Sequence, residues 1–160
     1  MSSSPPSESM DDQARRPRSG ATVLLVEDDP DQQWRLARLL TVHGHRVVGT
    51  STADGALALL EQWPMDLVLV DERLPGIEGV ALLERLRLRH PALALALMSE
   101  APDDELEADA ARLGVLALLA KPVASDQVTR LLEELRRARG RSAPPTSNQP
   151  FRASSWPPRP

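Results

Sequence analysis

The stretch "DLVLVDERLPGIEG", residues 66–79, runs from an apolar segment into an acid and then into a loop. The segment at 66–70 is short and alternates leucine with β-branched valine, which is typical of a strand buried on both faces. Asp71 follows the segment directly, and Pro75 and Gly76 come within five positions. We therefore expect a buried strand that presents the Asp71 carboxylate at one edge of a sheet, with a rigid loop beside it.

Apolar segments of similar length recur along the chain and alternate with longer amphipathic segments. The pattern predicts strands at 22–26, 46–50, 66–70, 92–98 and 115–120, each followed by a helix. Parallel strands need such long crossover connections, whereas antiparallel strands can be joined by tight turns. The order of the elements therefore predicts an α/β domain with a doubly wound parallel sheet covered by helices on both faces.

Capping residues mark the predicted helix ends. Asp29, Thr52 and Ser125 precede three of the helices and can accept hydrogen bonds from the first backbone N–H groups. Gly44 and Pro91 follow predicted helices and would end them. In the first helix we expect four apolar residues to lie near one face, and these are Trp34, Leu36, Leu39 and Leu40.

The two ends of the chain differ from its middle in composition. Residues 1–20 and 140–160 hold 9 of the 15 prolines, together with Ser and Arg and few aliphatic residues. Such segments bury too little apolar surface to offset the chain entropy that is lost on folding. We therefore expect a disordered N-terminal tail at 1–20, one domain at 21–139 and a disordered Pro/Arg-rich tail at 140–160.

Charge and composition exclude several classes of function. Residues 21–139 carry 13 Lys and Arg against 20 Asp and Glu, a net charge of −7, which argues against a nucleic-acid-binding surface. The chain has no cysteine, which excludes disulfides and thiolate chemistry. The N-terminal residues lack the apolar segment of a secretion signal, and no apolar run reaches the roughly 18 residues that span a bilayer. We expect a cytoplasmic protein that binds neither nucleic acid nor membrane.

Polar residues stand at the predicted carboxyl ends of four strands. Glu27 and Asp28 close the first strand, and Asp71 closes the third. Ser99 closes the fourth strand and Lys121 the fifth. In a doubly wound sheet the carboxyl ends of the strands meet at one edge, where functional groups gather. We therefore expect these five residues to form one site.

The charges of this predicted site indicate its chemistry. Carboxylates held close together in a half-buried cleft repel one another by roughly several kcal/mol per pair, so a cation has to compensate them. Lys121 supplies one positive charge, and Mg²⁺, which prefers oxygen ligands, would supply more. A metal and a lysine beside a carboxylate also suit phosphoryl transfer, with Asp71 as the nucleophile that forms an aspartyl phosphate. Ser99 can then donate a hydrogen bond to a phosphoryl oxygen.

Each of these residues also has a purely structural interpretation. We expect Asp29 and Asp31 to cap the first helix rather than to take part in the site. Ser99 alone could equally be a helix cap, and the Lys121-Pro122 pair alone is a weak signal. The joint occurrence of an acid pair, a single acid, a hydroxyl and a lysine at four strand ends favours a site.

Four segments, in their order and spacing, resemble the receiver domain of two-component response regulators over residues 21–138: "VLLVEDDP", "DLVLVDERLPGIEG", "ALMSE" and "LLAKP". The resemblance implies a flavodoxin-like (βα)₅ fold with strand order 2-1-3-4-5. It implies that Asp71 is the phosphoacceptor, Ser99 the switch hydroxyl and Lys121 the partner of the phosphoryl group. It also implies a Mg²⁺ site whose ligands are Asp71, Asp28, Glu27 acting largely through water, and the backbone carbonyl of Arg73.

Two positions depart from the pattern of the receiver family. Receivers that switch strongly usually carry Tyr or Phe three residues before the lysine, where this chain has Leu118. A small residue normally follows the switch hydroxyl, where this chain has Glu100, whose carboxylate would repel a phosphodonor or turn away into solvent. We therefore expect a complete phosphorylation site, with a modest response of the surface formed by the fourth helix, the fifth strand and the fifth helix.

The resemblance implies a single-domain response regulator that accepts a phosphoryl group on Asp71 from a histidine kinase or a phosphotransfer protein and signals through protein–protein interaction. Its only catalysis would be Mg²⁺-dependent self-phosphorylation and autodephosphorylation, so it would not be an enzyme acting on other substrates. We expect a monomer or weak dimer. The last 21 residues are too short and too proline-rich for a helix-turn-helix output domain.

Other classes of function remain as alternatives. The first is a phosphorylation-independent docking module on a receiver fold, which the changes at Leu118 and Glu100 favour. A metal-dependent phosphatase is disfavoured because Arg73 stands where such enzymes need a second acid. Dinucleotide binding is disfavoured because no glycine-rich motif follows the first strand.

Overall fold

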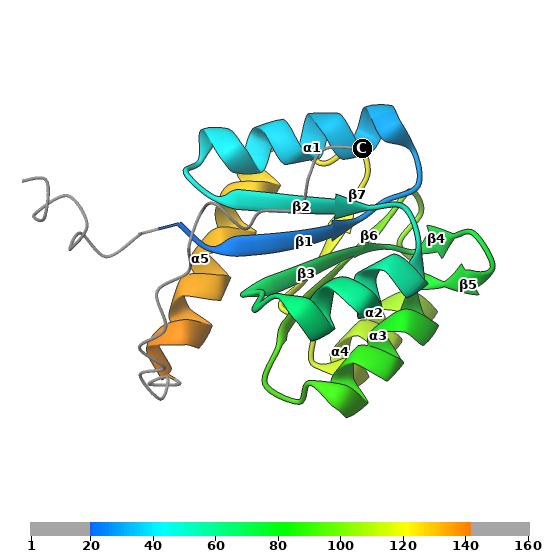
Figure 1. Ribbon diagram of the computed structural model, residues 1–160. Helices are drawn as coiled ribbons and strands as arrows, with labels where there is room; N and C mark the ends of the chain where they lie inside the picture. The colour runs from blue at the N-terminus through cyan, green and yellow to red at the C-terminus, as the bar shows by residue number, and fades with distance from the viewer. Residues whose placement is uncertain (1–19, 142–160) are drawn as a thin grey trace, which may run out of the picture.

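The computed structural model describes residues 20–141, so the predicted tails lie almost entirely outside the described residues. Five parallel strands form the main sheet, in the spatial order β2-β1-β3-β6-β7 (Figure 1). Counted along the chain, this is the order 2-1-3-4-5, so the predicted doubly wound sheet and its strand order are confirmed. The strands are β1 (Thr22–Val26), β2 (Arg46–Thr50), β3 (Leu67–Asp71), β6 (Ala94–Ser99) and β7 (Ala117–Ala120).

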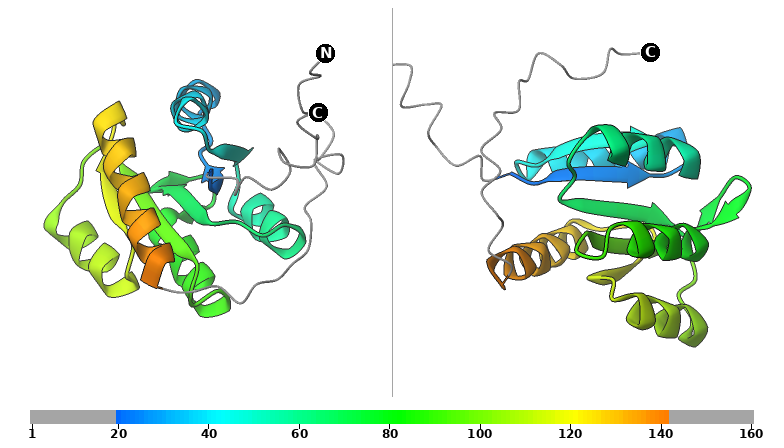
Figure 2. Two further views of the ribbon diagram at one scale, coloured as in Figure 1. Left: turned by 90° about the vertical axis from the view of Figure 1, so that its left-hand side faces the viewer. Right: turned by 60° about the horizontal axis from the view of Figure 1, so that its bottom comes forward.

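Helices cover both faces of the sheet, as Figures 1 and 2 show. One face carries α1 (Pro30–Val42) and α5 (Ser125–Arg141). The other carries α2 (Ala53–Gln62), α3 (Gly79–Arg89) and α4 (Asp104–Leu113). The last helix continues two residues beyond the predicted domain end at 139. None of the helices within 20–141 is long and apolar enough to cross a membrane.

Successive side chains along each strand point to opposite faces of the sheet, so the core consists of two layers. In β1, Leu24 and Val26 pack toward the layer of α2, α3 and α4, whereas Val23 and Leu25 pack toward α1 and α5. All five residues of β3 are buried, because this central strand has helices over both faces. The continuous apolar run that precedes Asp71 is therefore the sequence signature of a strand with two buried faces.

The predicted caps are confirmed for two of the three helices. The Asp29 side chain accepts hydrogen bonds from the first-turn N–H groups of α1, and Thr52 does the same for α2. Gly44 follows the end of α1 with a positive φ of 86°, as the predicted helix stop requires. Ser125 does not cap α5, because it is the first residue of that helix. Its hydroxyl instead lies 3.4 Å from His43 Nε2 at the end of α1.

The expected apolar face of α1 is wrong at one position. Leu36 and Leu40 are buried against the sheet, and Leu39 is partly buried beside them. The side chain of Trp34 points away from this face and is 62% exposed. The Arg38 guanidinium lies 5.5 Å from the centre of its ring, one helical turn along the exposed face. The helical period that buries Leu36 and Leu40 places Trp34 on the outer side.

A small hairpin after β3 was not predicted from the sequence. Two-residue strands, β4 (Arg73–Leu74) and β5 (Ile77–Glu78), pair antiparallel beyond the carboxyl edge of the main sheet. Gly76 stands in the turn with φ 75°, a conformation that glycine adopts without a steric penalty. The rigid loop expected at Pro75 and Gly76 is therefore this hairpin turn. Its strands are too short for an alternating pattern to reveal them.

Candidate functional site

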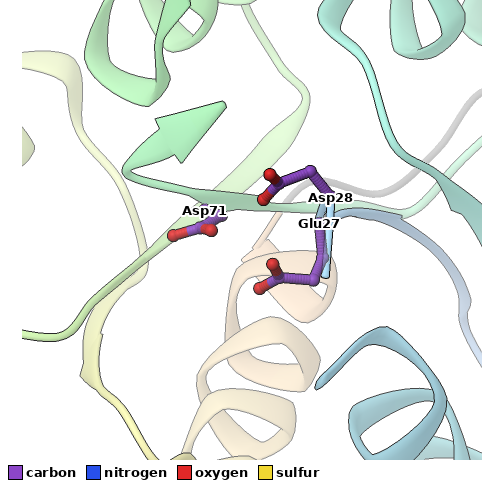
Figure 3. Close-up of side chains that lie close together, drawn as sticks. All are labelled: Glu27, Asp28 and Asp71. Carbon is purple, nitrogen blue, oxygen red and sulfur yellow. The ribbon is translucent and has the colours of Figure 1, made fainter. Parts of the chain in front are cut away.

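Three carboxylates from two neighbouring strands meet at the carboxyl edge of the sheet (Figure 3). Each of Glu27, Asp28 and Asp71 offers an oxygen atom, and these atoms all lie within 4.8 Å of one another. Glu27 and Asp71 are buried, whereas Asp28 is exposed. The pairing of β1 with β3 brings the acids together, because it aligns Val26 with Val70 directly before them. The predicted grouping of these acids is therefore what the structure shows.

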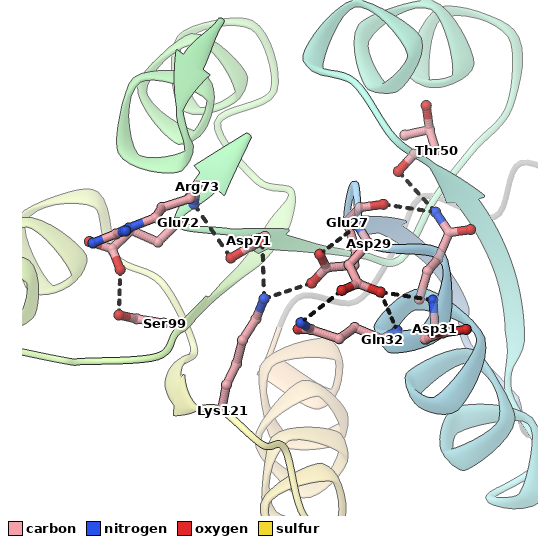
Figure 4. A network of polar contacts seen from close by, with 11 residues as sticks. Glu27, Asp29, Asp31, Gln32, Thr50, Asp71, Glu72, Arg73, Ser99 and Lys121 are labelled. Atoms are coloured by element: carbon pink, nitrogen blue, oxygen red, sulfur yellow. Dashed lines mark hydrogen bonds and ion pairs between the residues drawn. The ribbon is translucent and has the colours of Figure 1, made fainter. Parts of the chain in front are cut away.

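Lys121 joins two of the carboxylates from the end of β7. Its Nζ lies 2.8 Å from Glu27 Oε2 and 3.0 Å from Asp71 Oδ2 (Figure 4). The lysine side chain is 8% exposed, so water screens these two ion pairs little. The backbone N–H of Lys121 also donates to the Ser99 carbonyl at 2.8 Å, which fixes the end of β7 against β6. Residues 94 positions apart in sequence thus share one buried ion-pair network.

Burial and ion pairing set the protonation of this network. Burial raises the pKa of Glu27 above its ordinary value, although the hydrogen bond from Lys121 acts in the opposite direction. Burial lowers the pKa of Lys121, but its hydrogen bonds to Glu27 and Asp71 outweigh burial and leave the pKa above its ordinary value. Lys121 is therefore a cation near neutral pH.

The oxygen cluster fits a small hard cation. Three carboxylates facing one ammonium group leave uncompensated negative charge at the edge of the sheet. Mg²⁺ is usually held by one or two protein carboxylates together with water, and exposed Asp28 leaves room for such water. Glu27, Asp28 and Asp71 are thus the residues that would hold the ion. The backbone carbonyl of Arg73, which the family resemblance adds to this set, stays a prediction.

Hydrogen bonds at the carboxyl ends of β1 and β2 hold the acidic pocket in place. The N–H of Glu27 donates to the Thr50 carbonyl at 3.0 Å, and Gln33 Nε2 donates to the Glu27 and Thr50 carbonyls at 3.1 Å each. The N–H of Asp29 donates to Glu27 Oε1 at 3.1 Å. Asp29 itself caps α1 and Asp31 lies exposed in the first turn. Asp29 therefore caps α1 as expected, whereas Asp31 does not, and neither belongs to the oxygen cluster.

The loop after Asp71 packs tightly against the strand end. The Arg73 N–H lies 3.4 Å from Asp71 Oδ1, and the N–H of Gly79 donates to the Glu72 carbonyl at 2.6 Å. A Cβ atom at position 79 would collide with the Asp71 carbonyl oxygen and crowd Glu72. Glycine is therefore required where α3 begins, because the helix starts directly against the backbone of the phosphoacceptor candidate.

The hydroxyl of Ser99 has a partner that the sequence did not reveal. Ser99 is fully buried at the end of β6, and its Oγ donates a hydrogen bond to Glu72 Oε2. The same Oγ accepts a hydrogen bond from the Ala101 N–H at 3.1 Å. The sequence did contain a signal for this contact. Glu72 directly follows Asp71, and β3 is the neighbour of the strand that ends on Ser99.

The two unusual positions differ in their surroundings. Glu100 is exposed and has no ion pair within residues 20–141. Leu118 is paired with Leu97 in the sheet and packs, partly buried, against the core layer that contains Leu106 and Leu113. Leu118 therefore packs inward in the structure.

A groove of about 720 Å³ borders the site between α1 and the connection from β7 to α5. Glu27 and Lys121 belong to its lining, so the groove is continuous with the ion-pair network. Leu39 and Val123 contribute apolar walls, and Arg35 stands at its side with no ion pair among the described residues. The lining beside the site is therefore partly apolar and carries basic side chains together with the acids Glu27 and Glu100.

Comparison with known proteins shows the same domain in many regulators. The family model described as response regulator receiver domain matches residues 23–133. The chain is 32% identical over 111 residues to the DNA-binding transcriptional regulator NtrC of Salmonella typhimurium, covering 69% of this chain and 24% of that protein. It is 34% identical over 118 residues to the positive alginate biosynthesis regulatory protein of Pseudomonas aeruginosa, covering 72% of this chain and 47% of that protein. The chain thus spans about a quarter and about half of these relatives.

Solved structures agree with this assignment. A CheY-like response regulator receiver domain protein from Methanospirillum hungatei has a TM-score of 0.71 and 26% identity, covering 77% of this chain and 99% of that one. The signal receiver domain of an HD domain-containing protein from Pseudomonas fluorescens also has a TM-score of 0.71, with 27% identity and the same coverage. Because the family match spans most of the chain and the fold and pocket agree with it, the chain belongs to the response regulator receiver domain family.

Proposed function

We propose that Asp71 accepts a phosphoryl group from a phosphohistidine on a histidine kinase or phosphotransfer protein. A carboxylate oxygen of Asp71 forms the new P–O bond, the P–N bond to the donor histidine breaks, and its electron pair returns to the imidazole nitrogen. The observation that carries this proposal is the ion-pair network of Glu27, Asp71 and Lys121 at the sheet edge. The domain then signals by binding another protein.

The other pocket residues have supporting roles in this proposal. Lys121, already 3.0 Å from Asp71, pairs with the phosphoryl oxygens once the acid is modified. Mg²⁺ held by Glu27, Asp28, Asp71 and the Arg73 carbonyl would neutralise charge on the transferred group. The only reactions of the domain are phosphorylation of its own aspartate and hydrolysis of that acyl phosphate.

The acceptor can be tested with a small phosphodonor. The protein is incubated with acetyl phosphate and Mg²⁺, and the intact mass is measured before and after. We expect the wild type to gain one phosphoryl group, Asp71→Asn to gain none, and Asp54→Asn, an exposed acid in α2, to behave as the wild type. Labelling that persists in Asp71→Asn would refute the assignment of the acceptor.

One observation favours the second candidate function, a docking module that does not depend on phosphate. Leu118 is already packed inward in the structure, so the usual movement of an aromatic side chain at this position is not available. Amide NMR with beryllofluoride, an aspartyl-phosphate mimic, separates the two functions. Chemical-shift changes that extend from Asp71 to Leu118 and α5 support the phosphorylation switch. Changes confined to the pocket support the docking module.

A further inference from the structure

A phosphoryl group on Asp71 is expected to accept a hydrogen bond from the Ser99 hydroxyl, but in the structure this hydroxyl donates to another acceptor. A serine hydroxyl carries one hydrogen atom and can donate one hydrogen bond at a time. In the structure Ser99 Oγ donates to Glu72 Oε2, as Figure 4 shows. The hydroxyl therefore has to leave Glu72 before it can donate to a phosphoryl oxygen on Asp71.

The surroundings of Ser99 favour this contact. The residue is fully buried, so solvent water does not compete for its hydroxyl. The Ala101 N–H donates to the same oxygen at 3.1 Å and holds it in place at the end of β6. Hydrogen bonds to a charged acceptor are about twice as strong as those between neutral groups. The carboxylate of Glu72 is thus a strong competitor for the Ser99 proton.

Glu72 is itself held in position by the backbone of the sheet edge. Its N–H donates to the Met98 carbonyl at 2.8 Å, and its carbonyl accepts from the Gly79 N–H at 2.6 Å. Its carboxylate is partly exposed and has no ion pair within residues 20–141, and the Ser99 hydroxyl donates a hydrogen bond to it. In Figure 4 the Glu72–Ser99 pair lies on one side of Asp71 and Glu27 on the other.

We propose that Glu72 is a positioning residue that holds the Ser99 hydroxyl away from Asp71 in the unphosphorylated domain and so weakens retention of the phosphoryl group. The inference rests on the proposed function of Asp71. Glu72 touches no reacting atom and acts through Ser99. Breaking the Glu72–Ser99 hydrogen bond is a cost of every transition to the phosphorylated state, and removing Glu72 removes that cost.

The test measures the affinity of the folded domain for beryllofluoride in the presence of Mg²⁺. We expect Glu72→Ala to bind about tenfold more tightly than the wild type, because Ser99 is then free to donate. Glu72→Gln removes the charge but keeps an acceptor for Ser99, so its gain should be smaller. Glu78→Ala is the matched control, since Glu78 is an exposed acid in the same loop without a side-chain cap contact, and should bind as the wild type.

The decisive comparison is made in a Ser99→Ala background. There Glu72→Ala should bring no gain, because the hydroxyl through which Glu72 acts is gone. A gain of equal size in that background would show long-range charge repulsion and overturn the inference. Wild-type binding with no gain in Glu72→Ala would overturn the inference and leave the proposed function intact. Absence of binding by the wild type and all variants would overturn the proposed function itself.

Discussion

The side chain of Lys121 lies between two buried carboxylates, Glu27 directly after β1 and Asp71 at the end of β3. Its ion pairs with Glu27 and Asp71 are among the shortest between described residues, and both have little contact with water. Removing one partner of a buried ion pair leaves an uncompensated charge, which costs far more than breaking a surface pair. The stability of the unphosphorylated domain should therefore depend on this one lysine.

We predict that Lys121→Met lowers the free energy of unfolding by about 3 kcal/mol at neutral pH, because two carboxylates then face each other without a cation. Urea unfolding measures the change. Adding Glu27→Gln to this variant should restore part of the loss, since one of the two charges is then gone. Arg130→Met is the control, because it breaks an exposed pair in α5 worth about 0.5 kcal/mol or less. An equal effect of the two single substitutions would contradict the prediction.

The side chain of Arg87 links helix α3 to the end of α4 and to the loop before β6 through hydrogen bonds. Arg87 Nε donates to the Leu113 carbonyl at 2.9 Å and Nη2 to the Gly114 carbonyl at 3.2 Å. Its Nη1 donates to the carbonyls of Pro91 and Leu93, at 2.9 and 2.8 Å. The last carbonyls of a helix have no hydrogen-bond donor within that helix. Here the Arg87 side chain, which belongs to another helix, donates to the two carbonyls at the end of α4.

We predict that Arg87→Met destabilises the domain by about 2 kcal/mol, because four backbone carbonyls lose a charged donor. Hydrogen exchange should show the loss of protection first in the amides of α4. Arg85→Met serves as the control, since Arg85 is an exposed residue of the same helix without an ion pair among the described residues. Uniform loss of protection across the sheet, with α4 no worse than β3, would argue against this local role.

Across the molecule from the site, at the opposite edge of the sheet, side chains form hydrogen bonds with the start of β1. The Ala21 N–H donates to His45 Nδ1 at 2.9 Å, and the Thr22 N–H donates to Asp66 Oδ2 at 2.7 Å. These contacts join the start of β1 to the residues that precede β2 and β3. The first of them requires an unprotonated Nδ1, so it couples the stability of the domain to pH.

The pKa of His45 is lower in the folded protein than its ordinary value of 6.5. Burial is the main cause, and the positive charges of His43, Arg136 and Arg139 act in the same direction, while Asp66 opposes them. Between the folded pKa and 6.5 the unfolded chain therefore binds more protons than the folded one. The stability from neutral His45 is complete above pH 6.5 and is lost as the pH falls through the folded pKa.

We predict that the free energy of unfolding of the wild type falls as the pH is lowered from 7 through this window, and that His45→Asn has a flatter profile. Asparagine can accept the Ala21 hydrogen bond through its amide oxygen and does not titrate. Denaturant unfolding at several pH values measures both curves. His90→Asn, at the end of α3, should keep the wild-type slope. Parallel curves for the wild type and His45→Asn would contradict the assignment to His45.

The fold and the acidic pocket were predictable because their signals are local. Short apolar runs, the caps at Asp29 and Thr52, and polar residues directly after the strands can be read without knowing any long-range contact. Parallel strands then place Glu27, Asp71 and Lys121 at one edge, since the carboxyl ends of such strands meet there. The expectation that Trp34 lies on the apolar face of α1 was wrong because two residues correspond to about 200° around a helix, so Trp34 lies opposite Leu36.

The order of elements, the doubly wound sheet and the candidate pocket can be predicted from the chain without its coordinates, because periodicity and strand-end chemistry are properties of short segments. The pairing of polar groups across the sheet becomes visible only in the folded chain. The bonds from Ser99 to Glu72, from Arg87 to the end of α4 and from Ala21 to His45 are such pairings. Each of these hydrogen bonds joins segments that are distant in sequence, so it depends on the direction and burial of the side chains in the folded protein. A hydrogen bond tolerates a change of only a few tenths of an ångström in its donor–acceptor distance.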